Sequence, residues 1–139
     1  MIISELLDLG SKILRNSKIK TDQLDSELIL SNLLKKQREK FIITPEEKVS
    51  NCIVNNFNKL IIRRSTREPL AYILKKKEFW SNNFYVNRST LIPRPETELL
   101  CDIILKKIKY KNSHILDIGT GTGCILLSLL SEIKKAKGI

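Results

Sequence analysis

Apolar residues recur at helical spacing through the first part of the chain. In residues 3–15 and 21–36, leucine and isoleucine alternate with polar residues as they do in amphipathic helices. Thr21 or Asp22 can cap the second of these helices. A third helix is predicted to begin at Thr44, where Thr-Pro-Glu-Glu has the form of a capping box with proline at the first helical position, and to run to about Ser65. Its predicted apolar face consists of Val49, Ile53, Phe57, Leu60 and Ile61. Because helices this short need one another's apolar faces, we expect a small helical domain up to this point.

The pattern changes after Ser65. Residues 70–74 and 79–86 are rich in aromatic and β-branched side chains, and polar runs at 75–77 and 81–83 interrupt them. This pattern predicts short strands in a hairpin, with the lysine run 75–77 as a solvated turn.

A proline-rich segment then leads into another helix. Residues 90–95 are predicted to be extended, because each proline disfavours helix just before it. Pro95 can open the next helix, with Glu96 and Glu98 in its first turn, where they oppose the helix dipole. The predicted buried face of this helix consists of Leu99, Leu100, Ile103, Ile104 and Ile108.

The clearest chemical signal follows at Ile115–Cys124. A short apolar run contains Asp117 and ends in glycines at 119, 121 and 123, and an apolar helical pattern follows. This order predicts a buried strand, a tight turn and a helix. Glycine lets the backbone turn sharply and approach a ligand closely, and the helix would direct its N–H groups and the positive end of its dipole into the turn.

The glycine spacing separates the candidate ligands. No lysine follows, so this is no Walker A loop, and G-x-G-x-G differs from the dinucleotide fingerprint G-x-G-x-x-G. Asp-x-G-x-G-x-G is similar to the first motif of class I methyltransferases, which use S-adenosylmethionine. A glycine turn that only connects a strand to a helix, or a nucleotide site, remains an alternative.

Composition narrows the class of protein. The chain has 139 residues, 42% of them hydrophobic and 29% charged, which is typical of a globular protein with one ordinary domain or two small ones. Its net charge of +10 is compatible with RNA, a ribosome or an acidic protein partner, but a lysine-rich bias from an AT-rich genome gives the same charge.

The apolar segments and the cysteines indicate where the protein is located and whether it binds a metal. No segment approaches the ~20 apolar residues of a membrane span, and no basic n-region follows Met1, so neither a span nor a signal peptide is expected. Cys52, Cys101 and Cys124 are scattered, which argues against disulfides and a zinc site and fits a cytoplasmic protein. His114 is expected to be a loop residue before the strand.

Three stretches together point to one family. They are Glu68–Ile73 with Glu78–Trp80, then Leu91–Glu98, then Asp117–Gly123. With them, the chain resembles the release-factor glutamine methyltransferases of the HemK/PrmC family. Asp25-Ser26-Glu27 also matches an acidic element in the helical domain of that family.

The resemblance implies a fold of the α+β to α/β class. It implies a helical substrate-recognition domain at 1–68, a β-hairpin linker at 69–92, and the start of a class I, Rossmann-like methyltransferase domain at 93–139. It also implies transfer of a methyl group from S-adenosylmethionine to the glutamine side-chain amide in the Gly-Gly-Gln loop of a peptide chain release factor.

The resemblance also assigns residues to the cofactor. Asp117 would order the turn, and the loop from Gly119 to Gly123 would line the cofactor. The block Arg94, Pro95, Glu96 and Thr97 would lie over its methionine end, although a well-capped helix start explains this block as well. The cofactor-binding residues implied are thus Asp117, Gly119, Thr120, Gly121, Thr122, Gly123, Arg94, Pro95, Glu96 and Thr97, with no metal ligand.

The sequence departs from the family pattern in two ways. Lys75 stands where the family usually has glycine after Tyr-Ile-x, and the sequence ends at Ile139, where the family continues with an Asn-Pro-Pro-Tyr motif. Since that motif is absent, no catalytic residue is assigned, and we expect the chain to be inactive alone. With only one strand of the parallel sheet expected, we also predict a poorly stable half-domain that exposes an apolar patch.

Two other functions stay open. The basic charge is compatible with a fragment of a nucleic-acid adenine methyltransferase, although direct nucleic-acid binding is not predicted. A helical domain that looks complete also fits a non-catalytic module that still binds a release factor.

Overall fold

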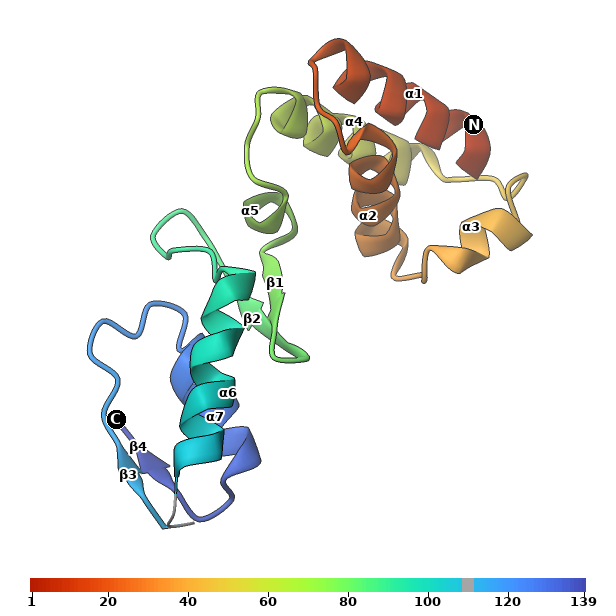
Figure 1. The fold of residues 1–139 in the computed structure, drawn as a ribbon. Coiled ribbons are helices and arrows are strands. Elements are labelled where there is room, and N and C mark those ends of the chain that lie inside the picture. Colours follow the sequence, from red (N-terminus) through yellow and green to blue (C-terminus); the bar gives the residue numbers. More distant parts are fainter. Residues whose placement is uncertain (109–111) are drawn as a thin grey trace. The chain divides into compact units, whose positions relative to one another are not determined.

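The computed structural model describes residues 1–108 and 112–139 and divides the chain into two compact units, Met1–Leu74 and Lys75–Ile139. In Figure 1 the first unit is coloured red to green and the second green to dark blue. Among the described residues, no helix is both long enough and apolar enough to span a membrane.

The first unit consists of helices. They are α1 (Ile3–Asn16), α2 (Asp22–Leu34), α3 (Glu39–Ile43), α4 (Asn51–Ser65) and α5 (Leu70–Leu74). The helices predicted for residues 3–15 and 21–36 are confirmed as α1 and α2. The short α3 was not predicted, because its five residues are too few to show a helical period.

Three helices, α1, α2 and α4, share one core, as each packs against the other two. Gly10 lets α1 approach this core closely, because a Cβ atom at this position would lie 2.6 Å from Cζ of Phe57. Ser26 is fully buried beside it, and its hydroxyl donates to the Leu7 carbonyl oxygen at 3.1 Å. The buried core residues are Ile3, Leu6, Leu14, Ile19, Ile29, Leu30, Phe41, Val49, Phe57 and Ile61.

A nearly buried ion pair joins α4 to α2. Nε of Arg64 lies 2.7 Å from Oδ2 of Asp25, and the exposed fractions of the two side chains are 17% and 6%. The Thr21 hydroxyl donates to the same carboxylate at 3.0 Å. Thr21 stands at the predicted cap position of α2, but its side chain accepts no hydrogen bond from a backbone N–H group of the helix. The ion pair with Arg64 and the bond from Thr21 explain why the Asp25 carboxylate can be buried in an otherwise apolar interface.

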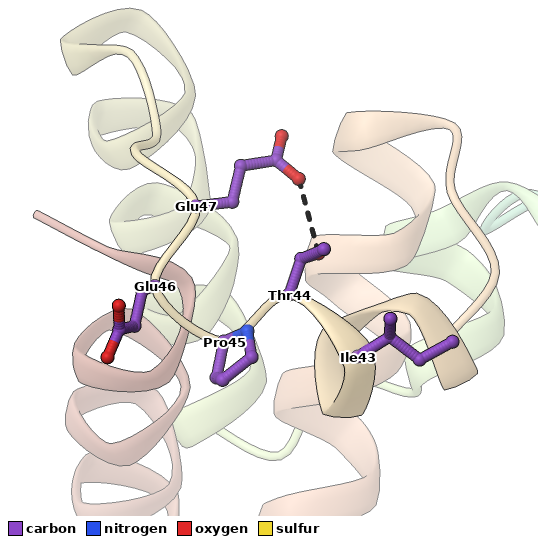
Figure 2. Close-up of a pocket in the computed structure, with 5 residues that line it drawn as sticks. All are labelled: Ile43, Thr44, Pro45, Glu46 and Glu47. Carbon is purple, nitrogen blue, oxygen red and sulfur yellow. Dashed lines mark hydrogen bonds between the residues drawn. The ribbon is translucent and has the colours of Figure 1, made fainter.

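The predicted helix start at Thr44 is wrong. Helix α4 begins at Asn51, and the cap is Ser50, whose hydroxyl accepts the Ile53 N–H at 3.5 Å. Figure 2 shows the predicted capping-box residues as an irregular loop, in which the Thr44 hydroxyl bonds to Oε2 of Glu47 at 3.4 Å.

Pairing with the N-terminus keeps this loop out of the helix. The Pro45 and Glu47 carbonyl oxygens accept N–H bonds from Ser4 and Ile3, each at 3.0 Å, and the Val49 N–H donates to the Met1 carbonyl oxygen at 3.1 Å. A helix begun at Thr44 would use these carbonyl groups internally, so tertiary pairing overrides the local capping signal.

The strand predicted at residues 70–74 is also wrong. These residues form α5, in which the Tyr72 and Ile73 N–H groups donate to the Pro69 carbonyl oxygen. Leu70 and Leu74 pack against the helical core, and this burial favours a helical turn over the strand preference of the segment.

A hairpin is confirmed, but not with the predicted turn. Strand β1 (Lys76–Phe79) pairs antiparallel with β2 (Asn82–Tyr85), so two of the three lysines predicted to form the turn lie in a strand, and Trp80-Ser81 forms the turn. Phe79 and Phe84 point to the buried face, with their ring centroids 6.2 Å apart and edge to face. Their alternation with polar neighbours sets the register.

The rest of the second unit alternates helix and strand. A 3₁₀ turn, η1 (Pro95–Thr97), leads into α6 (Glu98–Lys107), followed by β3 (His114–Ile115), α7 (Cys124–Glu132) and β4 (Lys137–Gly138). The predictions that Pro95 opens a helix and that a helix follows the glycine loop are confirmed.

The sheet differs from the prediction in two ways. Strand β3 pairs with β4 in parallel, so the expectation of a single strand of the parallel sheet is wrong. His114 lies in β3 itself rather than in a loop before it. Strand β3, α7 and β4 thus form a βαβ unit.

Several apolar residues predicted to be buried are exposed. Cys101 is the buried residue of α6, whereas the exposed fractions of Leu99, Leu100 and Ile103 are 63%, 45% and 40%. Leu116 and Ile118 of the predicted buried strand are likewise exposed. Within the described residues the parallel sheet consists of β3 and β4 alone, so it offers too little surface to cover these side chains. Exposed apolar residues are thus present as predicted, and the low stability of this half-domain stays a prediction.

Candidate functional site

The glycine loop lies between the carboxyl end of β3 and the start of α7. Gly119, Gly121 and Gly123 have φ angles of +80°, +59° and +75°, a region that residues with a Cβ atom rarely adopt. A Cβ atom at Gly119 would meet nothing within 4 Å, and one at Gly121 would meet only the Gly119 carbonyl oxygen, at 3.9 Å. The loop therefore has open space above its backbone at Gly119 and Gly121, whereas a Cβ atom at Gly123 would lie 3.2 Å from Cδ1 of Leu127.

Hydrogen bonds fix the end of the loop. The Gly123 N–H donates to the Thr120 carbonyl oxygen at 2.9 Å, and the Leu127 N–H donates to the Gly123 carbonyl oxygen at 2.9 Å, which begins α7. The first N–H groups of a helix have no acceptor within it, so α7 presents donors and the positive end of its dipole at the loop.

Two polar side-chain atoms at the loop are buried without a partner. They are Oδ2 of Asp117 and Oγ1 of Thr122, neither of which has a hydrogen-bond partner among the described residues. The backbone of Asp117 is fixed, because its N–H donates to the Ile139 carbonyl oxygen at 2.8 Å. Since buried polar atoms are nearly always hydrogen-bonded, these two atoms, beside an open glycine backbone, fit a polar ligand with donor groups.

The block predicted over the cofactor surrounds η1. Arg94, Pro95 and Glu96 are exposed and Thr97 is half-buried, and the Thr97 N–H donates to the Arg94 carbonyl oxygen at 3.0 Å. The helices that follow the block and the glycine loop, α6 and α7, pack against each other, and Figure 1 shows them starting at the same end of the pair. The fold thus brings the two predicted groups to neighbouring helix starts.

A contact that the sequence did not indicate joins these two helices. The Trp80 N–H donates to Oε1 of Glu98 in the first turn of α6, and Nε1 of Trp80 donates to Oε1 of Glu132 in the last turn of α7, each at 2.9 Å. Glu98 was assigned only a role toward the helix dipole. No spacing rule relates positions 80, 98 and 132, so only the fold reveals the contact.

Other polar groups have structural contacts. The Ser11 hydroxyl and the Arg15 guanidinium lower the pKa of Asp22, and the Lys36 ammonium lowers the pKa of Glu47. Burial raises the pKa of the Cys101 thiol. Among the described residues, no group of three or more His, Cys, Asp or Glu side chains could hold a metal ion.

A hollow of about 460 Å³ lies in the helical unit, lined by residues 43–47 (Figure 2). None of its residues belongs to the predicted cofactor site. It lies beside the loop that pairs with the N-terminus, and no buried polar atom without a partner lines it. The glycine loop is therefore the better candidate site.

A βαβ unit with a glycine loop at the carboxyl end of its first strand is the arrangement of cofactor-binding α/β domains. Comparison with known proteins identifies the family. Residues 5–74 match the family model of the PrmC N-terminal domain. The chain belongs to the family of release factor glutamine methyltransferases that carry this domain.

Similar proteins support the assignment over most of the chain. The release factor glutamine methyltransferase of Nitratidesulfovibrio vulgaris is 40% identical over 128 residues, which cover 91% of this chain and 43% of that protein. The release factor glutamine methyltransferase of Buchnera aphidicola subsp. Acyrthosiphon pisum is 45% identical over 115 residues, or 83% of this chain and 42% of the relative. A bifunctional methyltransferase of Rickettsia bellii is 31% identical over an aligned stretch that covers 97% of this chain and 29% of that protein. The chain spans less than half the length of these relatives.

Proposed function

We propose that this chain is the cofactor-loop and recognition part of a protein glutamine methyltransferase that acts on a peptide chain release factor in the cytoplasm. Residues 1–68 would recognise the release factor, 69–92 would form the hairpin linker, and 93–139 would begin the S-adenosylmethionine-dependent domain. The relatives carry the name of this activity, and the glycine loop supplies a physical basis for the cofactor.

The observation that supports the cofactor most directly is the pair of unpartnered oxygens beside the loop. Asp117 and Thr122 would accept hydrogen bonds from polar groups of S-adenosylmethionine, and the backbone of Gly119 to Gly123 would pack against it. Arg94, Pro95, Glu96 and Thr97 would lie at its methionine end. When bound, this cofactor supplies an electrophilic methyl group on a sulfonium.

The same chemistry limits what this chain does alone. An amide nitrogen is a poor nucleophile, because its lone pair is delocalised into the carbonyl group, so catalysis requires acceptors that hold the N–H groups and aim the nitrogen at the methyl group. The 139 residues contain no Asn-Pro-Pro-Tyr sequence that would supply them. We therefore propose cofactor binding by this chain without methyl transfer by it alone.

Calorimetric titration with S-adenosylmethionine tests the cofactor site. We expect binding by the wild-type chain, and roughly tenfold weaker binding by Thr122→Val, which replaces the hydroxyl with a methyl group of similar size. Ser131→Ala is the matched control, because this hydroxyl lies on α7 and bonds to the Ser128 carbonyl oxygen. Absence of binding by the wild type, or equal affinity of Thr122→Val, would refute the assignment.

A second candidate function is docking of a release factor without catalysis. It is favoured by the helical unit, which has its own buried core and matches the family model over nearly its whole length. A pull-down with purified release factor tests it, with and without S-adenosylmethionine. Retention in both conditions supports docking, and failure to retain the factor contradicts it.

A further inference from the structure

We propose that Trp80 is a positioning residue that fixes α6 against α7, and thereby holds the 94–97 block in register with the glycine loop. The proposal rests on the proposed function, since it concerns the same cofactor site. Nothing in the spacing of the sequence indicates this role, and it follows from contacts within the second unit.

Trp80 contacts both helices through different groups. Its backbone N–H donates to Glu98, one residue after the 94–97 block, and its indole N–H donates to Glu132, at the far end of the helix that the glycine loop begins. The ring also packs against the core cluster of this unit, in which Cys101 of α6 and Leu129 of α7 are buried. One residue therefore contacts, through its backbone and its side chain, the two helices that carry the two halves of the predicted site.

The backbone at Trp80 adopts a conformation that is unfavourable for a bulky side chain. Trp80 and Ser81 form the two-residue turn of the hairpin with φ angles of +50° and +58°. Turns of this kind favour Asn-Gly, because a bulky residue at positive φ is strained. A tryptophan at the first position costs conformational energy, and its two hydrogen bonds and ring contacts offset that cost.

The geometry determines which motion the contact restrains. The two hydrogen bonds join the first turn of α6 to the last turn of α7, so they resist sliding of one helix along the other. Sliding would move the 94–97 block relative to Asp117 and Thr122, and would weaken a ligand that touches both groups. Positioning, rather than contact with the ligand, is the role we assign to Trp80.

Hydrogen exchange tests this proposal without any ligand. We expect Trp80→Phe and Glu132→Leu to speed amide exchange in residues 95–107 and 124–132, because each variant removes the indole bond. Glu132→Gln should exchange as the wild type does, since its amide oxygen still accepts that bond. Tyr85→Phe is the matched control, because Tyr85 lies on the exposed face of the same hairpin.

Fluorescence provides the readout that a merely structural role would not change. Trp80 is the only tryptophan of the chain, so its emission reports on this contact directly. We expect S-adenosylmethionine to change the emission in the wild type and Glu132→Gln but not in Glu132→Leu, whose affinity should fall roughly fivefold or more.

Each outcome decides one claim. Unchanged exchange in Trp80→Phe and Glu132→Leu would overturn the positioning role, whether or not the cofactor binds. Faster exchange in these variants, together with no cofactor binding by the wild type, would support the positioning role and refute the proposed function. Equal cofactor affinity of wild type and Glu132→Leu would show that the contact does not act on the site, and would overturn the proposal.

Discussion

Replacing Gly10 with alanine sets helix propensity against packing, and the structure predicts which of the two is larger. Alanine in the interior of a helix is favoured over glycine by about 1 kcal/mol. At this position, however, the added Cβ would lie 2.6 Å from both Cζ of Phe57 and Oγ of Ser26. Phe57 and Ser26 are fully buried, so neither can move into solvent.

Overpacking of a close-packed core costs about 1–3 kcal/mol, and contact with two buried side chains at once places this variant in the upper part of that range. After subtraction of the propensity gain, we expect Gly10→Ala to lower the free energy of unfolding by about 1–2 kcal/mol. Urea unfolding of the full chain, followed by circular dichroism at a helical wavelength, measures this change. The midpoint should fall, while the slope of the unfolding free energy against urea concentration should stay the same.

A double-mutant cycle provides the control. Phe57→Leu shortens one of the two side chains that the new Cβ would meet, so in this background Gly10→Ala should cost clearly less than in the wild-type chain, because only the contact with Ser26 remains. If Gly10→Ala stabilises the wild-type chain, or destabilises both backgrounds equally, the close approach of α1 to α4 does not set the energetics and the reasoning is refuted.

Three further measurements test other contacts. Arg64→Met should destabilise the chain by about 3 kcal/mol because it leaves the Asp25 carboxylate buried and unpaired, and Arg64→Met combined with Asp25→Leu should cost less, as urea unfolding can show. The lowered pKa of Glu47 means that the folded state binds fewer protons than the unfolded state. The contribution of the Glu47 carboxylate to the stability of the folded state is therefore complete above its pKa in the unfolded chain. It is lost as the pH falls through its lower pKa in the folded chain. Glu47→Gln should thus flatten the acid side of a plot of melting temperature against pH, and an unchanged slope would contradict this assignment. Iodoacetamide should label the exposed Cys52 well before Cys101, whose burial raises its thiol pKa, and mass spectrometry measures both labelling rates. Equal rates would contradict the packing of α6.

Local sequence patterns were sufficient to predict a helix or turn where that element depends on its own residues. The helices α1 and α2, the proline that opens η1 and the helix that follows the glycine loop were predicted correctly, whereas the strand before the loop is His114–Ile115 and not the predicted apolar run from Ile115 to Ile118. Each of these depends on side chains within a few residues of one another or on backbone angles that only glycine adopts easily. The sequence motifs also indicate the family without any knowledge of tertiary contacts.

Prediction failed where distant partners compete for the same groups. The capping box at Thr44 yields to backbone pairing with the N-terminus, and residues 70–74 become a helix because their leucines pack against the helical core. Leu100 and Ile118 follow apolar patterns but are exposed, because burial depends on whether another layer covers them.

The sequence by itself determined the family, the order of most elements and the residues that can approach a polar ligand. The tertiary structure alone decided that Asp117 and Thr122 hold unpartnered oxygens at the glycine loop, and that Trp80 joins α6 to α7. The physical reason is range: spacing and backbone preference act over a few residues, whereas burial and hydrogen bonds across 18 or 52 positions exist only once the chain has folded.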